Sequence, residues 1–63
     1  MRERLREIRL KKGLTQEELA RKIGIDRSTY TNIELGYKNP SLKVALKIKE
    51  ELDYRDDNIF LKQ

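Results

Sequence analysis

Apolar residues recur along this chain at intervals of three and four positions, the spacing that places side chains on one face of a helix. No stretch alternates apolar and polar residues for long, so strand signals are weak and we predict an all-α fold. The first helix is expected over about residues 2–12, with Leu5, Ile8 and the aliphatic stem of Lys12 on its inner face. Gly13 follows as a typical stop signal.

Polar caps and glycines mark two further helices. Thr15 and Glu18 have the spacing of a capping box, which predicts the start of a second helix, and Gly24 predicts its end. Asp26 is suited to cap a third helix, and Gly36 ends it. The residues expected to face inward from these two helices are Leu19, Ala20, Ile23, Tyr30 and Ile33.

The last third of the chain predicts one more full helix and a short helical turn. Pro40 favours a turn, and Ser41 after it is suited to cap a fourth helix. The tail at residues 55–61 is predicted as one helical turn in which Ile59 and Phe60 seal the core. One side of the fourth helix is expected to carry Leu42, Ala45, Ile48, Lys49 and Leu52. We therefore predict a single compact domain, residues 1–63, of five short helices.

Composition excludes most catalytic chemistry. The 63 residues include no Cys and no His, which removes disulfides, thiolate nucleophiles, Cys-based zinc sites and the commonest general base. We therefore expect no enzyme, no metal and no cofactor, and no small-molecule ligand is evident. No apolar run approaches the roughly 20 residues needed to cross a bilayer, so no membrane partner is expected.

The charge of the chain is basic but unevenly placed. Lys and Arg total 15 against 11 Asp and Glu, a net charge of +4. Residues 1–14 hold six basic and two acidic side chains, whereas residues 15–41 and 42–63 are each neutral. A basic surplus is typical of nucleic-acid-binding domains, but a solvated surface explains it equally well.

A more specific signal is the connection between the second and third helices. Only Gly24, Ile25 and Asp26 join them, and two short helices with such a turn form a helix-turn-helix, here about residues 15–35. A plain corner between two helices has similar spacing, so the layout alone leaves both interpretations open.

The residues on both sides of this turn form a more specific pattern, which comprises Arg9, Gly13, Leu14, Thr15, Gln16, Leu19, Ala20, Gly24, Ser28, Ile33, Glu34, Gly36, Asn39, Pro40 and Ser41. The sequence resembles the Cro/CI-type (XRE) family of helix-turn-helix regulators from about residue 5 to residue 60. The resemblance implies a compact five-helix, lambda-repressor-like domain that binds double-stranded DNA sequence-specifically. It also implies a homodimeric transcriptional regulator, a repressor by expectation, in the cytoplasm of a bacterial or archaeal host or encoded by a phage.

The outer face of the third helix is the predicted base-contacting surface. Tyr30 and Ile33 define its buried direction, which leaves polar side chains on the other side. Arg pairs with guanine, Asn with adenine, and Ser or Thr with either, although an ordinary solvated face would look similar. The residues predicted to contact bases are Arg27, Ser28, Thr31 and Asn32.

Backbone contacts are expected on either side of that helix. Gln16 lies at the start of the second helix, where free N–H groups favour a phosphate oxygen. Tyr37, Lys38 and Asn39 form the loop into the fourth helix and are predicted to contact phosphates, although Tyr37 is also suited to packing under the loop.

The family resemblance further implies an ion pair between Arg9 and Glu34 that ties the first helix to the third. It also implies a dimer, for which Ile59, Phe60 and Leu61 are candidate interface residues. The alternative is that these three close the core of a monomer. A different class of function, a protein-binding module such as an antitoxin half, also stays open.

Overall fold

The computed structural model describes residues 1–61, which contain helices and no strand. The four α-helices and one 3-10 turn are α1 (Glu3–Lys11), α2 (Gln16–Ile23), α3 (Arg27–Leu35), α4 (Leu42–Leu52) and η1 (Asp57–Phe60). The all-α prediction is confirmed, but the expected count of five helices becomes four. The fifth segment is only a 3-10 turn, because its four residues are too few to propagate an α-helix.

Local side-chain chemistry sets the ends of α2 and α3. Thr15 and Glu18 form the predicted capping box: the backbone N–H of Glu18 donates to Thr15 Oγ1 at 3.0 Å, and that of Thr15 donates to Glu18 Oε1 at 2.8 Å. These bonds lower the pKa of the Glu18 carboxyl, because they favour its charged form. Gly24 ends α2 with φ 80°, a left-handed conformation that suits glycine.

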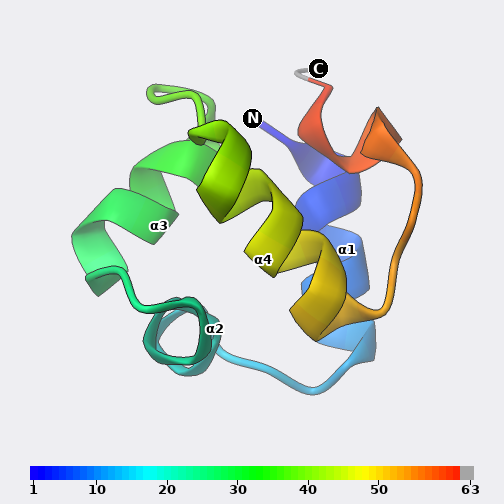
Figure 1. Ribbon diagram of the computed structural model, residues 1–63, viewed down its shortest axis with the longest axis horizontal. Coiled ribbons are helices and arrows are strands. Elements are labelled where there is room, and N and C mark those ends of the chain that lie inside the picture. The colour runs from blue at the N-terminus through cyan, green and yellow to red at the C-terminus, as the bar shows by residue number, and fades with distance from the viewer. Residues whose placement is uncertain (62–63) are drawn as a thin grey trace.

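The helices enclose one small core. Figure 1 shows α4 crossing in front of α1, with α2 and α3 to one side and η1 beside the start of α1, near the N-terminus. Because η1 contributes Ile59, the tail closes the core from the side opposite the α2–α3 pair. The buried apolar side chains are Leu5, Leu19, Ala20, Ile23, Tyr30, Ile33, Ile48, Leu52 and Ile59.

Two expectations about inward faces are wrong. Leu42 is 78% exposed, because the stripe of α4 that packs on the core runs through Val44, Ile48 and Leu52, and Leu42 points away from it. Lys12 lies beyond the last residue of α1 and is exposed, so its stem covers no core. Within residues 1–61, no helix is long and apolar enough to cross a membrane.

Candidate nucleic-acid interface

The turn between α2 and α3 fixes one helix on the other. The backbone N–H of Gly24 donates to the Arg21 carbonyl at 3.2 Å, and that of Ile25 donates to the Ala20 carbonyl at 3.0 Å. Ala20 is buried, and its small side chain lets the two helices pack closely. At the start of α3, the Asp26 carboxylate accepts from the Thr29 backbone N–H. The orientation of α3 is therefore set by α2 and by its own cap.

The outer face of α3 carries the four predicted base-contacting side chains. Arg27, Ser28 and Asn32 are exposed, and Thr31 is half-buried. Together these four line one shallow depression on the protein surface. A guanidinium, two hydroxyls and an amide supply both donors and acceptors within one concave patch, the chemistry that base edges require.

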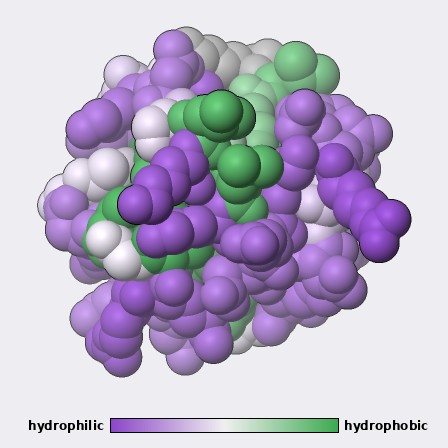
Figure 2. Space-filling view, viewed as in Figure 1, coloured by the Kyte–Doolittle hydropathy of each residue, from purple (hydrophilic) through white to green (hydrophobic). Residues whose placement is uncertain are grey.

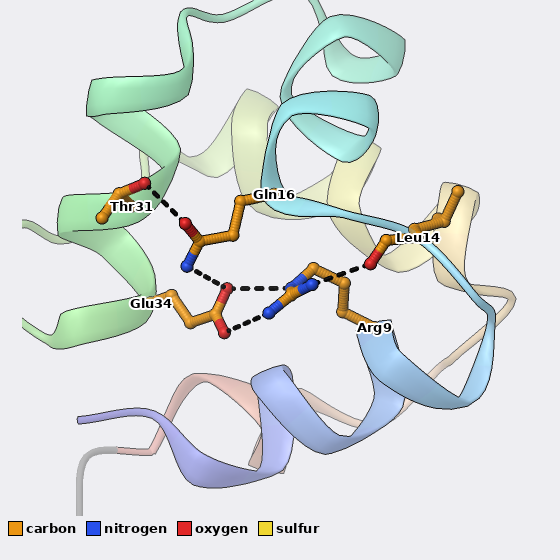
Figure 3. Close-up of polar contacts among 5 residues, drawn as sticks. All are labelled: Arg9, Leu14, Gln16, Thr31 and Glu34. Carbon is orange, nitrogen blue, oxygen red and sulfur yellow. Dashed lines mark hydrogen bonds and ion pairs between the residues drawn. The ribbon is translucent and has the colours of Figure 1, made fainter.

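A buried ion pair lies behind this face. Arg9 Nε donates to Glu34 Oε2 at 3.1 Å and Arg9 Nη2 donates to Glu34 Oε1 at 3.0 Å, so the predicted pair is present and bidentate (Figure 3). Arg9 Nη1 also donates to the Leu14 carbonyl at 2.7 Å. Burial would lower the pKa of the Arg9 guanidinium, but the hydrogen bonds and charge of Glu34 outweigh it and raise the pKa.

Gln16 and Thr31 extend this network between α2 and α3. The Thr31 hydroxyl donates to Gln16 Oε1 at 3.0 Å, and Gln16 Nε2 donates to Glu34 Oε2 at 3.4 Å (Figure 3). Two residues predicted to contact DNA separately therefore contact each other. The chain of bonds runs from Arg9 through Glu34 and Gln16 to Thr31, joining α1, α2 and α3.

The Tyr30 hydroxyl is enclosed near the ion pair without a hydrogen-bond partner among the described residues. Burial raises its pKa far above the ordinary value, and the charge of Glu34 adds to this effect. The hydroxyl therefore stays neutral at physiological pH.

The loop after α3 folds back on the end of that helix. The backbone N–H groups of Tyr37 and Lys38 both donate to the Asn32 carbonyl, at 2.9 and 3.2 Å. Tyr37 is 80% exposed, which excludes the alternative that it packs under the loop. Lys38 and Asn39 are also exposed. The loop thus presents a phenol, an ammonium and an amide beside the outer face of α3.

Arg2 was missed by the sequence analysis. Its side chain is 2% exposed and donates to the carbonyls of Phe60, Ile33 and Lys38 and to Asn39 Oδ1. Burial lowers the pKa of its guanidinium. No local signal distinguishes Arg2 from the other basic residues of the first segment, because all its side-chain partners lie at least 31 positions away.

The three candidate interface residues differ in exposure. Ile59 is fully buried in the core of its own chain, so its assignment to a dimer interface is wrong in this structure. Phe60 is half-buried and Leu61 is 62% exposed. Apolar surface also lies over α4 in Figure 2, where Leu42 and Leu46 are exposed.

Nothing in residues 1–61 resembles a metal site, since these residues hold no group of three or more His, Cys, Asp or Glu side chains arranged to bind an ion.

Comparison with known proteins gives the family. Residues 5–57 match the family model described as Helix-turn-helix. An uncharacterized HTH-type transcriptional regulator of Archaeoglobus fulgidus is 48% identical over 61 residues, covering 97% of this chain and 87% of the relative. The HTH-type regulator YqaF of Bacillus subtilis is 48% identical over 54 residues, covering 86% and 71%.

A solved structure agrees with both sequence comparisons. The crystal structure of the restriction-modification controller protein C.AhdI from Aeromonas hydrophila superposes with a TM-score of 0.83 at 44% identity, covering 94% of this chain and 89% of the other. The match to the family model begins within α1 and continues past the end of α4, so it includes the α2–α3 unit that presents the polar face, and the structural match covers 94% of the chain. The chain therefore belongs to the helix-turn-helix family of Cro/CI-type (XRE) transcriptional regulators, which bind DNA.

Proposed function

We propose that this chain regulates transcription by binding one double-stranded DNA sequence, with α3 inserted in the major groove. The observation that carries the proposal is the outer face of α3, where four hydrogen-bonding side chains share one depression while the opposite face is buried. A rigid helix with such a face fits the major groove, which admits an α-helix and offers distinct patterns of donors and acceptors.

We assign the base contacts from the hydrogen-bonding groups of each side chain. Arg27 is suited to guanine O6 and N7, Asn32 to adenine N6 and N7, and Ser28 to either. Thr31 is a weaker contributor, because its hydroxyl already donates to Gln16. The methyl group of Thr31 is the part of this side chain that is suited to an apolar contact with a thymine methyl.

The phosphate contacts are assigned to the two segments that flank α3. Gln16 lies in the first turn of α2, and its Nε2 has a second N–H beyond the one directed to Glu34. Tyr37, Lys38 and Asn39 lie in the loop after α3. Contacts from both segments would hold the helix in register on the duplex.

We further propose that two copies bind a near-palindromic operator and that binding represses transcription. One module of this size makes few base contacts, and a dimer with half-sites about 34 Å apart doubles them. Phe60, Leu61 and the exposed Leu42 and Leu46 are the apolar side chains suited to such an interface. Leu46 also lines a surface cavity with Lys49, Glu50, Asp53 and Arg55, and this mixture of charge signs is compatible with self-complementary pairing across a two-fold axis.

Selection from a random DNA library with the purified protein tests the proposal. We expect enrichment of one motif with two inverted half-sites, and binding that weakens steeply with salt. Sedimentation with and without that DNA measures the stoichiometry, for which we expect two chains per duplex. Recovery of no motif, together with salt-independent binding of a protein partner, would instead support a protein-binding module.

A further inference from the structure

Arg2 is buried more completely than Arg9 yet faces no carboxylate within residues 1–61. Its Nε donates to the Phe60 carbonyl at 2.8 Å, and its Nη1 donates to the carbonyls of Ile33 and, at 3.1 Å, Lys38. Its Nη2 donates to Asn39 Oδ1 at 2.7 Å. Four of the bonds available to one guanidinium are therefore made to segments that are distant in sequence.

The carbonyl partners show what this side chain is suited to do. Ile33 lies in the last turn of α3, and the Arg2 backbone N–H donates to the Glu34 carbonyl in the same turn at 2.7 Å. The end of a helix concentrates partial negative charge on carbonyls that lack helical partners, and a cation is favoured there. Arg2 therefore joins the end of α3 to the loop at Lys38 through hydrogen bonds to backbone carbonyls rather than through an ion pair.

The contact with Asn39 fixes the orientation of its amide. A guanidinium only donates hydrogen bonds, so the oxygen of the amide must face Arg2. The Nδ2 group then faces away, makes no hydrogen bond to the described residues, and belongs to an exposed side chain. Asn39 therefore presents a hydrogen-bond donor to the solvent. Its neighbour Lys38 is held by the same guanidinium, which donates to the Lys38 carbonyl.

We propose that Arg2 is the positioning residue of the DNA-backbone contact: it locks residues 37–39 onto the end of α3 so that Asn39 Nδ2 and the Lys38 ammonium are directed at the phosphates. The inference rests on the proposed function and adds a residue that sets the position of the protein along the DNA duplex. Because one guanidinium holds both α3 and the loop, the distance between base-contacting and phosphate-contacting side chains is fixed before DNA arrives, which favours binding by preorganisation.

The test compares Arg2→Lys with Arg6→Lys, an exposed position in the helix α1 that Arg2 precedes, so that net charge is constant in all proteins. Affinity for a random-sequence duplex is measured by fluorescence anisotropy over a salt series, at a temperature where circular dichroism shows each variant folded. For Arg2→Lys we expect affinity to fall about five- to tenfold and the salt slope to flatten by about 0.9, one phosphate contact. Arg6→Lys should match the wild type.

The outcomes separate the two proposals. Wild-type protein that binds neither the random duplex nor any duplex recovered by selection overturns the proposed function itself. If the wild type binds and a folded Arg2→Lys variant shows the same affinity and salt slope, Arg2 has only a structural role and the inference is wrong.

Asn39→Asp gives a second test that does not depend on the folding of an Arg2 variant. Aspartate still accepts from Arg2, so the thermal midpoint should equal or exceed that of the wild type. It lacks the outward donor and places a negative charge where the phosphate would lie, so affinity for the random duplex should fall about tenfold or more. Retention of wild-type affinity would overturn the assigned amide orientation.

Discussion

Replacing Glu34 by Ala should remove much of the stability of this domain. The carboxylate accepts two hydrogen bonds from Arg9 and one from Gln16, and it is completely buried. In the intact protein Arg9 is only 6% exposed, and without Glu34 its guanidinium keeps, among residues 1–61, the hydrogen bond to the Leu14 carbonyl alone. Breaking a buried pair from one side costs about 3–5 kcal/mol, because the remaining charge is neither hydrated nor paired.

That cost is large relative to the total free energy of unfolding of the domain. At about 0.05–0.15 kcal/mol per residue, a domain of this length is stable by roughly 3–9 kcal/mol. Each kcal/mol corresponds to about 4–8 °C in Tm for a small domain, so a loss of about 3–5 kcal/mol lowers Tm by roughly 12–40 °C. Urea unfolding followed by circular dichroism measures the free energy, and an unchanged m value would show that two-state unfolding is retained.

Two control variants test whether the cost of Glu34→Ala comes from the unpaired charge of Arg9. Glu17→Ala breaks the exposed pair between Arg21 and Glu17, which lie 3.4 Å apart, and should cost less than about 1 kcal/mol. The double variant Arg9→Met with Glu34→Leu removes both charges and should recover part of the loss, since no uncompensated charge remains. A Glu34→Ala cost below about 1 kcal/mol, or a double variant less stable than Glu34→Ala, would refute the argument.

Four further predictions concern DNA and the helix ends. Asn32→Ala should weaken binding to the selected operator by about 1–3 kcal/mol and relax the preference at one base pair, as competition with mutated operators would reveal. Lys38→Ala should weaken operator and random duplex alike and reduce the salt slope by about one, measured by anisotropy. Thr15→Ala should cost about 1 kcal/mol in urea unfolding through loss of the cap. The capping box lowers the pKa of Glu18, so its contribution is present above the unfolded pKa and is lost as pH falls through the folded value; Glu18→Gln should therefore flatten the acid side of the stability profile.

Much of the candidate site could be predicted because it depends on helical periodicity. Once Tyr30 and Ile33 are buried, the geometry of a helix leaves Arg27, Ser28 and Asn32 on the outer face, whatever else surrounds α3. The same reasoning misplaced Leu42, since several registers of an amphipathic helix bury comparable apolar area. The position of α4 on the core selected one of them.

The sequence by itself determined where α2, α3 and α4 begin and where α2 and α3 end. The bonds that set these ends join residues three to five positions apart, as Thr15 with Glu18 and Asp26 with Thr29, so they form in any tertiary context. Only the tertiary structure decided that Arg2 is buried and that Gln16 and Thr31 contact each other. Each of these contacts spans 15 or more residues, and many side chains have the right chemistry for it. Packing brings one of them within hydrogen-bond distance, and that proximity is a property of the assembled fold.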